Sequence, residues 1–422
     1  MEDLEVWARE LLFGKEKPIP CPSLPHPPTL SGGSPTLSGG SRSFVEDNNG
    51  FALAMYRQLR QQPGNLFFSP FSIRTALGMT FAGARGETAS QMRDALCISS
   101  LDETLHVTLA ETIQRLNACS HGNYEMVVAN SLWGQEGSPF QPEFLDLIAQ
   151  HYRGAMNFVD FRYRTEATRV TINQWVEDKT RRKIQELIPL GSLKTDTRLA
   201  LVNAIYFKGM WMQQFPKVAT SVKPFHLEDG RKVETPLMYQ QEEFRCLQAG
   251  GYQAVELAYR GGDLSMLVLL PDRKDGLRDL EKTLSPRMLQ DCVAQMGTCE
   301  IKLYLPRFKI TWGTVNLNDH LTVLGMPLAF TRGQANFSGI NGHEPPHEDS
   351  LFISAVFHKA FVATNEEGTE AAAATAIADY VLDVPPPVPT FCADHPFLFV
   401  IRDRKSGAIL FLGRMADPSR ES

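Results

Sequence analysis

Hydrophobic residues recur at helical spacing through the first half of the chain. Phe51, Met55 and Leu59 are four residues apart, which places them on one face of a helix. The pair Ser69-Pro70 precedes an apolar run and is typical of a helix start, because proline fits the first helical turn. A longer stripe predicts another helix and consists of Ile172, Trp175, Val176, Thr180, Ile184 and Leu187. We expect these stripes to face a hydrophobic core.

The second half of the chain has the pattern of a strand-rich fold. Short apolar runs alternate there with turn signals such as Asp229-Gly230 and Asp275-Gly276. Helices come early and strands late, without the regular βαβ alternation of a parallel sheet. The pattern therefore predicts an α+β fold.

The first part of the chain differs in composition from the rest. Residues 18–41 are rich in Pro, Gly and Ser, and the sequence PTLSGGS occurs twice in tandem, at 28–34 and 35–41. Such a composition is typical of a flexible linker. We therefore expect a flexible N-terminal extension over 1–42 and one large domain over 43–422. Residues 1–17 could form an amphipathic docking helix or a tail without a function.

Composition and charge narrow the classes of partner. The 422-residue chain is 43% hydrophobic and 21% charged, an ordinary profile for a globular protein with a large core. The net charge of −6 does not indicate a nucleic-acid-binding protein. Apolar runs such as Met266 to Leu270 are far shorter than the roughly 20 residues that a membrane span needs. We expect neither nucleic acid nor a membrane among the partners.

The N-terminus and the cysteines both indicate a reducing compartment. The sequence opens with MEDLEVWARELLFGKEK, which is acidic and lacks the apolar stretch of a secretory signal. We therefore expect a cytoplasmic protein, and leave open an export that needs no leader. The seven cysteines are odd in number and include no CxxC pair, so we expect free thiols rather than a disulfide framework.

Enzyme motifs are missing from the sequence. The Walker A loop, GxGxxG and GxSxG are all absent. The segment HEPPH at 343–347 has the spacing of the zinc motif HExxH, which needs a helix to place both histidines on one face. Two prolines prevent that helix, so we expect a polar surface loop and no metal. His358 stands alone before Lys359, and the sequence does not supply a set of nucleophile, base and orienting group, so we expect neither enzyme activity nor a cofactor.

The most unusual segment is alanine-rich and starts at Glu366. It reads EEGTEAAAATA, and its composition alone favours a helix. However, Ile377 to Val384 follow, and then the proline-rich sequence PPPVP, into which a helix cannot continue. A segment of about 20 residues therefore links two ordered parts, and loops of that length are usually functional or disordered.

Several motifs along the chain resemble those of the serpin family, over residues 43–417. In chain order they are NLFFSPFSI from Asn65, NAIYFKGMW from Asn203, LPRFK from Leu305, ANFSGI from Ala335, FCADHPFLF from Phe391 and ILFLGR from Ile409. Their order is more specific than any one motif. The motif at Phe391 is similar to the intracellular branch, of ovalbumin-like or prokaryotic type.

The resemblance implies a fold and a mechanism. The fold would contain three β-sheets, eight or nine helices and an exposed reactive-centre loop at about 366–390. The protein would be a monomer and a suicide inhibitor whose partner is a serine protease. The protease attacks a bait bond and forms a covalent acyl-enzyme. The cleaved loop then inserts into the central sheet and distorts the trapped protease.

The hinge of this loop has the composition that insertion requires. By the family register, the inward-facing residues are small or apolar, namely Thr369, Ala371, Ala373, Thr375 and Ile377. The outward-facing residues, which water would tolerate, are Glu370, Ala372, Ala374 and Ala376. Gly368 can supply the turn where the strand begins. Burying a charge would cost several kcal/mol, so the hinge indicates an inhibitor. Asp379 departs from the pattern, because it continues the inward alternation with a charge.

The usual family spacing from Thr369 places the bait bond at Leu382–Asp383. Leucine suits chymotrypsin-like, elastase-like or subtilisin-like proteases. Tyr380–Val381 is an alternative bond, and an aspartate-specific or cysteine protease is an alternative target. A non-inhibitory serpin, acting as a chaperone or carrier, is the rival function.

The resemblance also assigns two buried sites in the central sheet. The shutter is a hydrogen-bonded cluster where the sheet parts, and its residues are Ser69, Ser72, Asn203 and His358. The breach is where the hinge first enters, and its residues are Trp211 and Glu366.

Overall fold

The computed structural model describes residues 39–118, 123–152, 156–368 and 388–420. The helices are α2 (Gly39–Leu59), α3 (Pro70–Phe81), α4 (Gly86–Ala95), α5 (Asp102–Ala118), α6 (Pro142–Tyr152), α7 (Thr165–Lys179), α8 (Leu277–Thr283), α9 (Pro286–Gln295), α10 (Asn318–Val323) and α11 (Ser338–Asn341), with the short 3-10 helices η1 (Lys217–Ala219) and η2 (Pro327–Phe330). The strands are β1 (Leu66–Phe68), β2 (Tyr124–Gln135), β3 (Met156–Val159), β4 (Leu199–Gly209), β5 (Ser221–His226), β6 (Lys232–Ala249), β7 (Tyr252–Ala258), β8 (Leu264–Pro271), β9 (Gly297–Pro306), β10 (Phe308–Asn316), β11 (Ala355–Thr364), β12 (Thr390–Cys392), β13 (Phe397–Asp403) and β14 (Ile409–Met415). The fold is α+β, as the sequence predicts.

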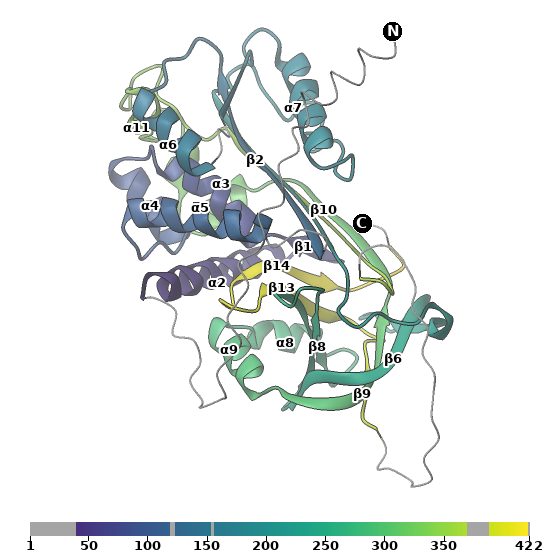
Figure 1. Cartoon of the computed structure of the whole chain (residues 1–422). Helices are drawn as coiled ribbons and strands as arrows, with labels where there is room; N and C mark the ends of the chain where they lie inside the picture. Colours follow the sequence, from purple (N-terminus) through teal and green to yellow (C-terminus); the bar gives the residue numbers. More distant parts are fainter. Residues whose placement is uncertain (1–38, 119–122, 153–155, 369–387, 421–422) are drawn as a thin grey trace, which may run out of the picture. The chain divides into compact units, whose positions relative to one another are not determined.

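The strands form two sheets within the described ranges (Figure 1). One has five strands in the order β10-β11-β4-β2-β3, and the other has nine, in the order β1-β14-β13-β8-β7-β6-β9-β12 with β5 beside β6. The resemblance implied three sheets. The long strand β6 pairs with β9 over Leu237–Cys246 and with β7 over Arg245–Ala249. Because β6 pairs with both neighbours, the strands on either side of it belong to one nine-stranded sheet.

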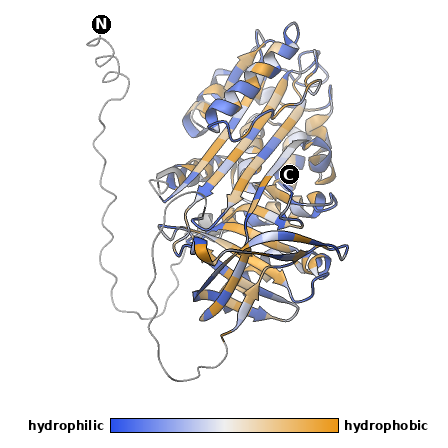
Figure 2. Cartoon of the chain, turned by 90° about the vertical axis from the view of Figure 1, so that its right-hand side faces the viewer, coloured by the Kyte–Doolittle hydropathy of each residue, from blue (hydrophilic) through white to orange (hydrophobic). Residues whose placement is uncertain are grey.

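The five-stranded sheet is covered on both faces. Successive residues of β4 point to opposite sides: Leu201 and Ile205 lie in the large core cluster with α3, whereas Val202 and Ala204 lie in a second cluster with residues of α7. A strand buried on both faces reads as an unbroken hydrophobic run rather than an alternating one. The hydrophobic strands of this sheet are visible in Figure 2.

Two of the predicted helices are confirmed. Phe51, Met55 and Leu59 all lie in α2, and each is fully buried. Helix α3 begins at Pro70, and the Ser69 hydroxyl caps it by accepting a hydrogen bond from the Ser72 amide at 3.1 Å. Of the described helices, none combines the length and the apolar character needed to cross a bilayer.

The predicted helix over 172–187 is wrong in its second half. Helix α7 ends at Lys179, because Arg181 and Arg182 adopt left-handed backbone angles, with φ of 50° and 59°. Ile184 and Leu187 are nevertheless fully buried in the same cluster as the α7 side chains. The hydrophobic spacing therefore identified the buried residues but not the end of the helix.

Helix α2 starts earlier than the expected domain boundary. It begins at Gly39, inside the second PTLSGGS repeat, so the last residues of the predicted linker are helical. Once a helix is nucleated by a packed face, each added residue gains one hydrogen bond. The buried face farther along α2 can therefore extend the helix into a glycine-rich sequence.

The expectation of free thiols is wrong for one pair of cysteines. Cys246 of β6 and Cys299 of β9 form a disulfide, with 6.4 Å between their Cα atoms. Phe244 is the direct partner of Cys299, so Cys246 is its diagonal neighbour on the same face. The register of strands this far apart in sequence cannot be read from cysteine spacing. Cys97, Cys292 and Cys392 are free.

Candidate functional site

The candidate site is the centre of the five-stranded sheet, where two neighbouring strands run parallel. Strand β11 pairs with β4 from Ala355 opposite Ala200 to Val362 opposite Phe207. The flanking pairs, β10 with β11 and β4 with β2, are antiparallel. A strand inserted antiparallel to both β4 and β11 would therefore make the four central pairs antiparallel. The described residues that directly follow β11, Asn365 to Gly368, lie at the end of these two strands.

The residues after β11 reverse the direction of the chain. Asn365 and Gly368 exchange two backbone hydrogen bonds, from the Asn365 amide at 2.9 Å and from the Gly368 amide at 3.1 Å. Gly368 also forms an antiparallel bridge with Met210, directly after β4. The chain has thus turned back at the sheet end where both central strands finish.

Position 368 requires glycine, because of its backbone conformation and because neighbouring atoms lie close to it. Its φ of +113° is a conformation that residues with a side chain rarely adopt. A Cβ atom here would lie 2.3 Å from the Gly209 carbonyl oxygen and 2.4 Å from the Trp211 amide nitrogen. Glycine therefore permits both the turn and the close contact with β4.

Trp211 holds the turn against the end of the sheet. Its side chain is only 2% exposed and stacks on Tyr259, with ring centroids 4.6 Å apart. The indole Nε1–H donates to the Asn365 carbonyl oxygen at 3.0 Å, and the Trp211 amide donates to the Glu367 carbonyl oxygen, also at 3.0 Å. The residue satisfies two carbonyl groups of the turn.

Glu366 is a buried carboxylate that accepts hydrogen bonds from two side chains. It is 2% exposed, and the Arg307 Nε donates to its two oxygens at 2.7 and 2.9 Å. The Thr220 hydroxyl donates to the same carboxylate. Burial by itself raises the pKa of Glu366, but the hydrogen bonds from Arg307 and Thr220 outweigh it, so the pKa is lowered. The side chain is therefore ionised and paired at neutral pH.

Glu367, the next residue, is paired with a different cation. It is 6% exposed, and its carboxylate forms an ion pair with Lys217 of η1, whose side chain is 60% exposed. Both carboxylates thus bind residues in or next to η1, and Glu366 is also bound by Arg307. No motif or spacing in the sequence indicated a role for Glu367 or Lys217.

The four residues assigned to the shutter form one hydrogen-bonded cluster between α3 and the central strands β4 and β11. The Ser69 hydroxyl donates to the Leu410 carbonyl oxygen at 2.7 Å. The Asn203 side-chain amide donates to the Ser72 hydroxyl oxygen at 2.6 Å. The cluster joins α3 and its cap to β4.

His358 connects this cluster to β11. Its Nδ1 is hydrogen-bonded to the Asn203 side-chain carbonyl oxygen, and its Nε2 accepts from the Ser69 amide at 3.4 Å. These roles assign the proton to Nδ1. Since His358 on β11 is the direct strand partner of Asn203 on β4, their contact bridges the two strands that insertion would separate.

Asn130 of β2 is a member of the cluster that sequence reasoning missed. Its side-chain oxygen accepts from the Ser72 hydroxyl at 3.0 Å and from the Asn203 amide, and its own amide donates to the Ser72 carbonyl oxygen at 3.1 Å. Its position in a strand gave no sequence signal, because only the pairing of β2 with β4 places Asn130 opposite Asn203.

The rest of the expected site lies outside the described residues. This applies to the hinge positions Thr369 to Ala376, and to both candidate bait bonds, Leu382–Asp383 and Tyr380–Val381.

Comparison with known proteins assigns the family. The family model for serpins, described as serine protease inhibitors, matches residues 46–418. The chain is a serpin. The human leukocyte elastase inhibitor is 40% identical over 389 residues, with 88% of this chain and 98% of the relative covered. Human serpin B4 is 38% identical, with 89% of this chain and 100% of the relative covered.

Solved structures agree with this assignment. Uncleaved ovalbumin superimposes with a TM-score of 0.79 at 30% identity, covering 89% of this serpin and 100% of ovalbumin. An Arabidopsis serpin in its native stressed conformation has a TM-score of 0.80 at 29% identity, covering 90% and 99% of the two chains. The protein thus belongs with the ovalbumin-like serpins.

Acid should destabilise this serpin through His358. Complete burial lowers the pKa of His358 from 6.5 to about 3. Below pH 6.5 the unfolded chain therefore binds a proton that the folded chain excludes, so stability falls as the pH drops towards 3. At pH 5 the loss from this residue should be about 2 kcal/mol. Urea unfolding at pH 7 and pH 5 measures it, and His358→Gln should show a smaller loss. An identical pH dependence in the variant would contradict this role for His358.

Proposed function

We propose that this serpin is a suicide inhibitor of serine proteases with elastase-, chymotrypsin- or subtilisin-like specificity. In this mechanism the hinge after Gly368 inserts between β4 and β11. The observation that carries the proposal is the antiparallel bridge of Gly368 to Met210, beside a pair of parallel central strands. The leukocyte elastase inhibitors among the relatives support an elastase-like target.

A register for the inserted strand follows by extending the pairing of the described turn. Continuing the pairing of Asn365 with Gly368 brings Thr369 opposite Thr364 and Ile377 opposite Val356. Continuing the pairing of Met210 with Gly368 brings Ile377 opposite Leu201 of β4. The existing register of β11 and β4 pairs Val356 with Leu201, so the two extrapolations agree.

This register supports the inward set that the family resemblance assigned. Val356, Ala360 and Val362 of β11 lie in the large core cluster. Directly opposed residues of paired strands share a face, so the hinge residues at these positions would face the core. They are Ile377, Ala373 and Ala371, in that order.

The other face of the hinge would not be open to water along its whole length. Phe357 and Phe361 of β11 lie in the second cluster, with residues of α7. The residues opposite them would be Ala376 and Ala372. We therefore expect small size to matter on this face as well, because α7 covers it.

Thr375 would enter the shutter itself. In this register it lies opposite both His358 and Asn203, the two residues whose hydrogen bond joins β11 to β4. A threonine hydroxyl can donate and accept. It can therefore replace the hydrogen bond that insertion breaks, where an apolar residue would leave two buried polar groups unpaired.

The same register removes the difficulty with Asp379. This residue would lie opposite Leu199, the first residue of β4, and opposite Ser354, just before β11 begins. Complete filling of the space between the strands therefore needs the chain only as far as position 378. The aspartate would be at the end of the sheet rather than in its centre.

Mixing the protein with neutrophil elastase, chymotrypsin or subtilisin tests the proposal. We expect an SDS-stable complex larger than either partner. The C-terminal peptide released by cleavage should begin at Asp383 in mass spectrometry, whereas a peptide that begins at Val381 would move the bait bond to Tyr380–Val381. Complete cleavage without a complex would instead indicate a non-inhibitory serpin.

A further inference from the structure

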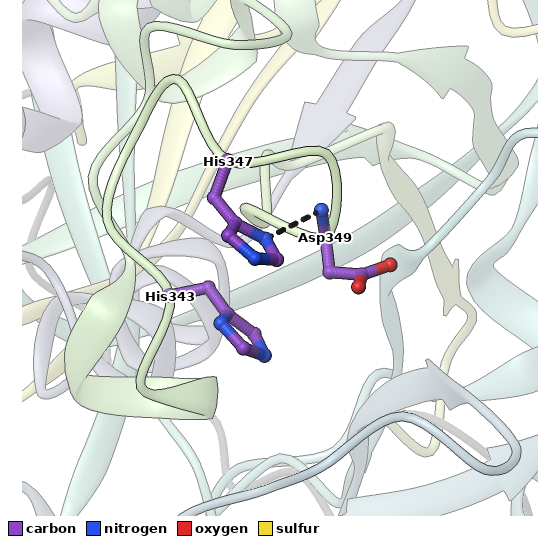
Figure 3. Close-up of side chains that lie close together, drawn as sticks. All are labelled: His343, His347 and Asp349. Carbon is purple, nitrogen blue, oxygen red and sulfur yellow. Dashed lines mark hydrogen bonds between the residues drawn. The ribbon is translucent and has the colours of Figure 1, made fainter.

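The segment HEPPH at 343–347 lies in the loop between α11 and β11. It forms no helix, as its prolines predict. The turn nevertheless brings His343 and His347 together, with parallel rings whose centroids are 4.2 Å apart. Asp349 lies beside them (Figure 3). One nitrogen of each histidine and a carboxylate oxygen of Asp349 all lie within 4.8 Å of one another.

A buried asparagine holds the two ends of this loop. Asn341 is 2% exposed, and its side-chain oxygen accepts from the His343 amide at 3.2 Å. Its side-chain amide donates to the Asp349 carbonyl oxygen at 2.8 Å. Asn341 therefore fixes the backbone of the first and last members of the cluster, which limits the entropy lost when the three side chains converge.

We propose that His343, His347 and Asp349 bind a divalent transition-metal ion such as Zn²⁺. Two imidazoles and a carboxylate are a donor set for zinc and its neighbours, whereas Ca²⁺ and Mg²⁺ prefer oxygen ligands throughout. Zinc–ligand bonds of about 2.0–2.1 Å place tetrahedral ligands about 3.4 Å apart. The cluster reaches that spacing by side-chain movement, since His347 and Asp349 are exposed. Water completes the coordination.

One hydrogen bond must change when the metal binds. The Asp349 amide donates to the His347 Nδ1 at 3.1 Å, so that nitrogen carries no proton in the metal-free state. Coordination of the metal through Nε2 moves the ring proton to Nδ1, which can then no longer accept from the Asp349 amide. Coordination through Nδ1 replaces the hydrogen bond with a bond to the metal. In both cases the Asp349 amide loses its acceptor, which gives a local spectroscopic signal of binding.

Charged residues around the loop have opposite effects on its affinity for a metal ion. Glu344 and Glu348 are exposed in the same loop and add negative potential. Arg198 interacts electrostatically with Asp349 and competes with the metal for its carboxylate. Protons also compete with the metal for the imidazole nitrogens, so binding weakens at acid pH.

Calorimetric titration of the EDTA-treated full chain with Zn²⁺ tests the site. We expect His347→Ala and His343→Ala each to weaken binding more than about 100-fold, and Asp349→Asn to weaken it about tenfold. Glu348→Gln is the matched control, because it removes the same charge from the same loop, and it should change the affinity less than about twofold. The Asp349 amide resonance should shift with Zn²⁺ and not with Mg²⁺.

Three results would overturn the site. They are a Zn²⁺ affinity that both histidine variants retain, an equal loss in Glu348→Gln and Asp349→Asn, and an Asp349 amide that does not respond to zinc. Unchanged thermal unfolding of each metal-free variant shows that a lost signal reflects the ligands rather than the fold.

Discussion

Replacing Thr369 by arginine should convert this serpin from an inhibitor into a substrate of its target protease. In the proposed register, position 369 lies opposite Thr364, which is 4% exposed, on the face of the large core. Burying an unpaired charge costs several kcal/mol, and about 3 kcal/mol in the barrier slows insertion on the order of 100-fold. Hydrolysis of the acyl-enzyme then precedes insertion. The stoichiometry of inhibition should rise more than about tenfold, and the SDS-stable complex should fade.

Glu370→Arg is the matched control for this variant. Position 370 would face the other side of the sheet, opposite the half-buried Ala363 near the end of β11. We expect it to keep most of the inhibition, because an arginine there can reach solvent. Full inhibition by Thr369→Arg, or an equal loss in both variants, would refute the proposed register.

Removing the Glu366 carboxylate should have the largest effect on the stability of the uncleaved protein. Glu366→Ala leaves Arg307 without its buried partner and the Thr220 hydroxyl without its acceptor. Breaking a buried ion pair costs about 3–5 kcal/mol, and we expect the lower end, about 3 kcal/mol, because the Arg307 side chain is 44% exposed. The midpoint of urea unfolding measures this loss.

The exposed pair of Asp229 and Arg231 provides the comparison. Their side chains are 52% and 67% exposed, so Asp229→Ala should have little effect on the urea midpoint. Arg307→Ala should resemble Glu366→Ala, and the double variant should cost less than the sum of the two, because the pair is removed as a unit. Additive losses would show that Glu366 and Arg307 are not coupled.

The pattern of hydrophobic and polar residues predicted features of the helices that depend on neighbouring residues. The start of α3 followed from Ser69-Pro70, and the buried face of α2 followed from the four-residue spacing of its apolar residues. The end of α7 could not be predicted in this way. Ile184 and Leu187 continue the helical spacing but reach the same core from an irregular segment. Periodicity reports which residues are buried, and a tertiary core can bury them in either conformation.

The partners of the hinge carboxylates could not be predicted from local sequence either. Glu366 was singled out by resemblance, yet its donors Arg307 and Thr220 are 59 and 146 residues away in sequence. Nothing in a spacing rule joins them. The LPRFK motif that contains Arg307 was noted, but only folding shows that its arginine reaches the turn after β11.

The loop at 343–347 shows that local sequence also failed to predict a contact between two side chains. Its prolines correctly excluded the helix of a zinc protease, and the absence of a metal was expected from that exclusion. A turn can also place two histidines side by side, as the ring spacing of 4.2 Å shows. Excluding one backbone conformation does not exclude the proximity of two side chains.

The sequence by itself determined the α+β class, the start of α3 and the buried face of α2, because each is set by neighbouring residues and their period. The tertiary structure decided the parallel pairing of β4 with β11, the reversal at Gly368, the Cys246–Cys299 pair and the inclusion of Asn130 in the shutter. These features depend on which strands lie side by side and in what register. Register is chosen by the fit of whole hydrophobic faces across the core, and no single segment of the chain contains that information.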